Sequence, residues 1–133
     1  MLLVLAAPPS GADASQPAIE VRASAAVPAI KRILAADHLD IDRLSSAEIA
    51  GRMEAIPRGA APVAFWQAYQ KHVAAWRTYA DAEARSRAGE PGDVEAEFRA
   101  AAVATARLRI NQSFDAVEII ARSYGITPPS RSR

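Results

Sequence analysis

The chain has 133 residues, which is the length of one ordinary domain. It contains no cysteine, and this excludes disulfides, thiolate metal sites and a cysteine nucleophile. Sixteen basic and fifteen acidic residues give a net charge of +1, so no overall field favours nucleic acid or an anionic membrane. Half of the residues are hydrophobic, many of them alanine, and this composition indicates a modest core closed by closely approaching helices.

The first residues resemble a secretory signal. Met1 to Ala7 form an apolar run that is too short to span a bilayer, and Ala12-Asp13-Ala14 has the A-x-A pattern of a cleavage site. No basic residue precedes the run, and a true start further upstream would supply one. We therefore predict a signal-like segment at residues 1–14 and a periplasmic or secreted protein. The alternative is a cytoplasmic protein with an apolar N-terminus.

Residues 15–26 are small and polar and predict a linker, followed by a single helical domain at residues 27–125. Pro28 suits the first turn of a short helix that ends near His38. Ser45 and Glu48 have the spacing of a capping box, which predicts the start of a second short helix. That helix carries apolar residues at i, i+4 and i+7: Ile49, Met53 and Ile56.

Two long helices are predicted in the second half of the chain. The first runs from Pro62 to about Ala88, and the second runs from an N-cap at Asp93 to Tyr124. Because the loop between them is short, they form an antiparallel hairpin. The predicted fold is all-α, with the hairpin packed by the two short helices, and residues 126–133 are predicted to form a disordered tail.

One face of the first long helix carries most of the aromatic residues of the chain. Eight side chains fall within an arc of about 140° on a helical wheel: Phe65, Trp66, Tyr69, His72, Val73, Trp76, Tyr79 and Ala80. Core packing is the favoured interpretation, with Trp76 near the centre of the arc and more buried than Trp66. The alternative is that Trp66, Tyr69 and His72 form a binding site for a protein or an apolar small ligand.

The second long helix is apolar on two flanks. One stripe consists of Val103, Ala106, Ile110, Phe114, Val117, Ala121 and Tyr124, and the other of Val94, Phe98, Ala101, Thr105, Leu108 and Ile119. A polar stripe lies between them, formed by Arg107, Asn111, Asp115, Glu118 and Arg122. Two apolar flanks predict cover on both sides, from the short helices or from another subunit, so the chain is a candidate homo-oligomer through this helix.

No catalytic or phosphate-binding motif is recognisable, and no cofactor is predicted. Basic residues are interleaved with acidic ones, which argues against nucleic-acid binding. The favoured hypothesis is an exported, non-catalytic binding or interaction module without a transmembrane span. The alternative is a small enzyme or metal-binding protein that uses His72 or the acidic cluster at residues 37–42.

Overall fold

The computed structural model describes residues 16–129, with side chains from residue 23 onward. The described part of the chain contains four helices: α1 (Gln16–Ala36), α2 (Ser46–Glu54), α3 (Val63–Ala88) and α4 (Ala96–Ser123). No strand occurs within these residues, and the predicted all-α class is confirmed. The predicted signal-like segment lies outside the described residues.

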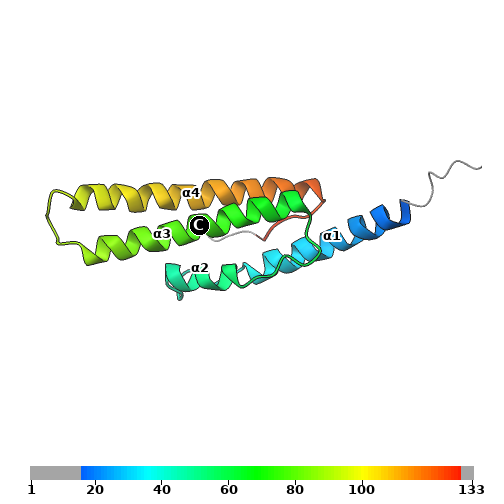
Figure 1. Ribbon diagram of the computed structural model, residues 1–133, viewed down its shortest axis with the longest axis horizontal. Helices are drawn as coiled ribbons and strands as arrows, with labels where there is room; N and C mark the ends of the chain where they lie inside the picture. The colour runs from blue at the N-terminus through cyan, green and yellow to red at the C-terminus, as the bar shows by residue number, and fades with distance from the viewer. Residues whose placement is uncertain (1–15, 130–133) are drawn as a thin grey trace, which may run out of the picture.

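The two long helices α3 and α4 lie side by side and are joined at one end by a short loop (Figure 1). The helices α1 and α2 lie along the other side of α3, so α3 is the central helix of the domain (Figure 1). The predicted hairpin is therefore present, with α1 and α2 on the side of α3 away from α4. The first turns of α1 extend past the open end of the hairpin (Figure 1).

The core is a single apolar cluster to which all four helices contribute. Its fully buried members include Ile30 and Ile33 from α1, Met53 from α2, Phe65 from α3 and Val117 from α4. The core face of α4 is the stripe that begins at Val103, and from Ala106 to Ala121 its members are buried. Tyr124 at the end of this stripe is exposed.

Helix α2 begins where the capping box predicts. The Ser45 hydroxyl accepts the backbone N–H of Glu48, and the Glu48 carboxylate accepts the backbone N–H of Ser45. The bond from this backbone N–H holds the pKa of Glu48 below its usual value, so the carboxylate stays ionised in mild acid. At the other end of α2, Arg77 of α3 pairs with Glu54 at 2.7 Å. This pair and the buried Ile49 fix α2 against α3.

Two predictions for the N-terminal half are wrong. Residues 16–26 are helical rather than a linker, and Pro28 lies well inside α1 instead of in its first turn. Alanine has the highest helix propensity of all residues, and Ala23, Ala25 and Ala26 carry the helix into the proline. Ala26 is buried, so tertiary packing also stabilises this part of α1.

The ends of α4 also differ from the prediction. The N-cap is Glu95 and not Asp93, and the Asp93 carboxylate accepts hydrogen bonds from Arg99 at 3.0 and 3.1 Å. Beyond α4, Gly125 adopts a left-handed φ of 75° that turns the chain back toward the core. Ile126 is 5% exposed and Pro128 is buried, so the chain is packed past residue 125, where we predicted that the tail begins. Residues 130–133 lie outside the described part.

Candidate functional site

The aromatic side chains predicted to form a binding site belong mainly to the core. The rings of Phe65 and Tyr69 are stacked with centroids 6.3 Å apart, and His72 packs against Phe114 of α4 at 5.2 Å. Tyr69 and His72 are fully buried. Trp66 is partly exposed and lies 5.7 Å from the Tyr69 ring. Of the three predicted site residues, only Trp66 therefore reaches the surface.

The buried His72 is held by a hydrogen bond across the α3–α4 interface. Its Nδ1 lies 2.9 Å from the hydroxyl oxygen of Ser113, and that hydroxyl donates to the carbonyl of Ile110 at 2.9 Å. The direction of the bond between Nδ1 and the Ser113 hydroxyl depends on the tautomer of His72. The imidazole therefore has a structural role between α3 and α4. This agrees with the core-packing interpretation of the aromatic arc.

A second buried polar contact joins α3 to the end of α1. The Tyr69 hydroxyl donates to a carboxylate oxygen of Asp37 at 3.2 Å, and Asp37 is only 6% exposed. These residues are separated by 32 positions in the sequence, so the contact links the end of α1 to α3 across the core. Asp37 therefore has a structural role, different from that of the other acids in the predicted cluster.

The loop at residues 37–42 borders a pocket of about 620 Å³, with Trp76 and Arg107 on its far sides. Within the loop, Asp40 accepts the backbone N–H of Asp42 at 3.2 Å and pairs with Arg43 at 3.4 Å. Ile41 of the same loop is 51% exposed.

This arrangement does not favour a metal site. Among the side chains that the structure describes, no group of three histidine, cysteine, aspartate or glutamate residues is close enough to hold a metal ion. The acids of the loop instead cap their own turns and bind neighbouring side chains, as loop acids commonly do.

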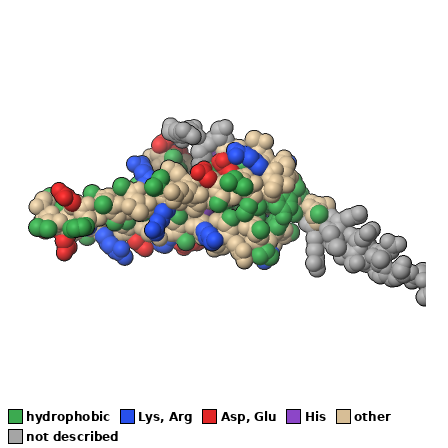
Figure 2. All heavy atoms as spheres, turned by 90° about the horizontal axis from the view of Figure 1, so that it is seen from above, with side chains coloured by type: hydrophobic (Ala, Val, Ile, Leu, Met, Phe, Trp, Pro, Cys, Tyr) green, Lys and Arg blue, Asp and Glu red, His purple; other side chains and the backbone are tan. Residues whose placement is uncertain are grey.

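The most unusual surface of the molecule is the outer face of α4, which points away from the core. Four large apolar side chains there are strongly exposed: Val94 at 87%, Phe98 at 72%, Leu108 at 56% and Ile119 at 66%. Seen from the side of α4, apolar side chains lie among charged ones along the length of the molecule (Figure 2). The second apolar stripe read from the sequence is this face, and neither α1 nor α2 covers it.

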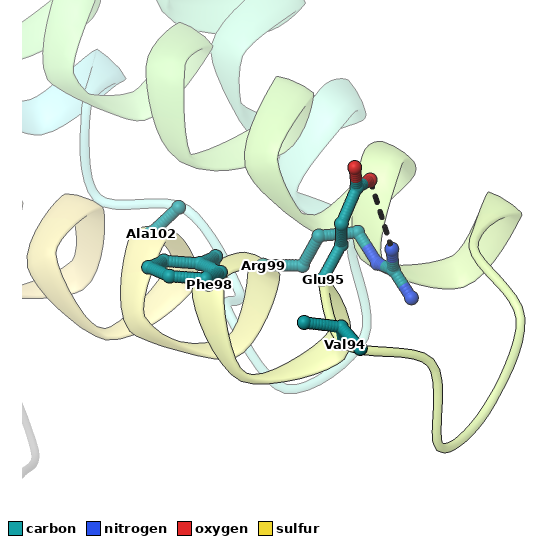
Figure 3. Close-up of a pocket in the computed structure, with 5 residues that line it drawn as sticks. All are labelled: Val94, Glu95, Phe98, Arg99 and Ala102. Atoms are coloured by element: carbon teal, nitrogen blue, oxygen red, sulfur yellow. Dashed lines mark ion pairs between the residues drawn. The ribbon is translucent and has the colours of Figure 1, made fainter.

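The N-terminal part of this face is a shallow hollow. Phe98 lies between Val94 and Ala102, while Glu95 and Arg99 form an ion pair beside them (Figure 3). Arg99 also donates to the Glu90 carbonyl at 3.0 Å and to Asp93, which fixes the hairpin loop. The start of α4, and hence the exposed Phe98, is held in place by these contacts.

The chain was compared with protein-family models, curated proteins and solved structures. Nothing matches in any of the three comparisons. Within residues 16–129, no helix is both long and apolar enough to cross a membrane.

Proposed function

We propose that this chain is a non-catalytic interaction module that binds a partner helix through the outer face of α4. The observation that carries the proposal is the set of large apolar side chains exposed on that face, led by Phe98 and Val94. Val94 and Phe98 lie together at the N-terminal end of this face, and large exposed apolar patches mark interaction sites. A long helix with a regular apolar stripe fits another amphipathic helix better than a small ligand.

The burial of the candidate catalytic residues supports binding rather than catalysis. Tyr69 and His72 are closed off in the core and hydrogen-bonded to Asp37 and Ser113. A general base must reach the proton that it removes, and a fully buried imidazole has no access to a substrate. Binding through the exposed apolar face requires no general base.

Site-specific photo-cross-linking in the native host tests the proposal. A photoreactive phenylalanine analogue at Phe98 should give a defined cross-linked species, and the same analogue at the exposed Gln67 of α3 should give none. Leu108→Glu in the same chain should abolish the product, because it places a charge in the docking surface. Equal products from both positions, or none from Phe98, would contradict the proposal.

We further propose that the module is exported. Helix α1 begins at Gln16, so cleavage after Ala14 leaves the whole helical domain intact. The mature protein should begin at or near Ser15 and occur in the cell envelope or the medium. Intact-mass measurement on fractionated cells, with the natural start of the gene, checks this prediction. Full-length protein confined to the cytoplasm would refute it.

A further inference from the structure

The outer face of α4 has the side-chain spacing of a paired helix. From Val94, in the turn just before α4, residues recur at intervals of four and three: Val94, Phe98, Ala101, Thr105, Leu108 and Gln112. This is the repeat of the inner positions of a coiled coil, and each of these side chains is exposed in the single chain. None of the six is charged, and Asp115 at the next position of the repeat ends the uncharged stripe before Ile119. A second helix that contacts this face would therefore cover one uncharged stripe over about five turns.

From this face we infer that the partner is a second copy of the same chain, with the two α4 helices antiparallel and related by a two-fold axis near Val103. The inference rests on the proposed interaction function and names the occupant of that surface. An isologous contact of this kind needs a stripe that is complementary to itself when reversed. The α4 stripe meets this requirement at its inner positions and on the edge that carries Glu95 and Arg109.

At the inner positions, the reversal places large side chains opposite one another and small ones near the axis. Phe98 faces Leu108 of the second copy, and Ala101 faces Thr105 of the second copy. Val94 then faces the polar but uncharged Gln112 at each end of the contact. The small side chains at the centre allow the two helix axes to approach closely, since the interaxial distance follows the side chains at the contact.

The edges of the stripe give charge complementarity. On one edge lie Glu95, Ala102 and Arg109, spaced seven residues apart. In the antiparallel pair, Glu95 of each copy lies beside Arg109 of the other, and Ala102 lies beside itself at the axis. Glu95 is 84% exposed, and its contact with Arg99 is long at 3.9 Å, so its carboxylate is accessible to a second cation.

A parallel pair lacks this complementarity. Its edge contacts join positions five residues apart, which puts Glu97 beside Ala102 and Ala104 beside Arg109. No ion pair forms in that arrangement, whereas the antiparallel one forms two by symmetry. The charges on α4 therefore favour the antiparallel direction, and electrostatic complementarity of this kind selects orientation more than it adds affinity.

Cysteine cross-linking tests both the dimer and its direction, because the chain has no cysteine of its own. Ala102→Cys places a thiol at the axis, and a short bismaleimide should join two copies. Gln112→Cys is the matched control on the same exposed stripe. In the antiparallel pair its two thiols are about 27 Å apart, at 1.5 Å per residue over eighteen residues, so no product should form. Cross-linking of Gln112→Cys but not Ala102→Cys overturns the antiparallel arrangement.

The mass of the unmodified protein in solution gives an independent readout. Analytical ultracentrifugation should report twice the chain mass of 14.1 kDa. Phe98→Glu should raise the dimer dissociation constant about tenfold or more, as expected for a central aromatic contact. Gln67→Glu, which adds the same charge on the exposed side of α3, should leave it unchanged. Unchanged helical circular dichroism shows that each variant is folded.

The two proposals fail in different ways. A protein that stays monomeric, while Phe98 still cross-links to a different protein in the host, overturns the second copy and keeps the interaction module. A monomer that gives no cross-link from Phe98 overturns both.

Discussion

Replacing Trp76 by alanine should lower the free energy of unfolding by about 3–5 kcal/mol, a large share of the stability of a small domain. The Trp76 ring is 8% exposed, belongs to the central cluster and contacts Tyr79 edge-on with centroids 6.0 Å apart. Its removal would deprive the cluster of its contacts and enlarge the pocket that Trp76 borders with Ile49 and Met53. Chemical denaturation monitored by circular dichroism measures the loss.

Two further variants separate the causes of this effect. Trp66→Ala should cost clearly less, because Trp66 is partly exposed and packs against the rim of the cluster. Trp76→Phe should also cost less than Trp76→Ala, because the buried indole Nε1 has no hydrogen-bond partner within the described residues, and the new ring fills much of the space. Equal destabilisation by Trp66→Ala and Trp76→Ala would show that both rings are core residues of equal weight.

Replacing Tyr69 by phenylalanine should lower the free energy of unfolding by about 1–3 kcal/mol. The substitution keeps the ring, which stacks on Phe65, and deletes only the hydroxyl that donates to Asp37. Hydrogen bonds to a buried carboxylate are worth more than neutral ones, because the carboxylate has given up water. Tyr124→Phe is the matched control, since Tyr124 is 37% exposed, and it should be nearly neutral.

A double-mutant cycle isolates this contact from the rest of the core. Tyr69→Phe and Asp37→Asn are measured alone and together by denaturation, and a coupling energy of about 1 kcal/mol or more is expected for a direct buried bond. Additive effects would mean that Asp37 and Tyr69 act independently.

The features predicted best from the sequence are those set by local chemistry. The capping box of Ser45 and Glu48 determines the start of α2 within a few residues of chain, and the apolar periodicity of α3 determines its buried face. The relative burial of Trp66 and Trp76 follows from the same periodicity. In each case the deciding interactions lie within one helix.

Where side-chain contacts outside the helical pattern decide, the prediction fails or is silent. Asp93 has the features of an N-cap, yet the nearby Arg99 takes its carboxylate, and α4 begins later. Pro28 suits a helix start, but the buried Ala26 and Ala29 on either side keep it within α1. The partners of His72 and Tyr69 lie 41 and 32 residues away, and helical periodicity contains no information about such pairs.

The sequence predicts the exposed face of α4 as a second apolar stripe. It does not predict which element, if any, covers that stripe. Periodicity shows that Phe98 and Leu108 share a face, and it does not show whether α1 or α2 reaches them. In the structure α1 and α2 both lie on the other side of α3 (Figure 1), so they leave the stripe exposed.

The position of α1 has a consequence for how the chain is made. A ribosome releases α1 and α2 first, and Ile30 and Ile33 then have no surface to cover them until α3 follows. The helices α3 and α4, by contrast, are consecutive in the chain, and their hairpin can form as soon as its own residues emerge. The apolar core side chains of α1 therefore stay exposed until α3 and α4, which complete the core, have been synthesised. A chaperone that holds nascent α1 would shorten the interval in which it can aggregate.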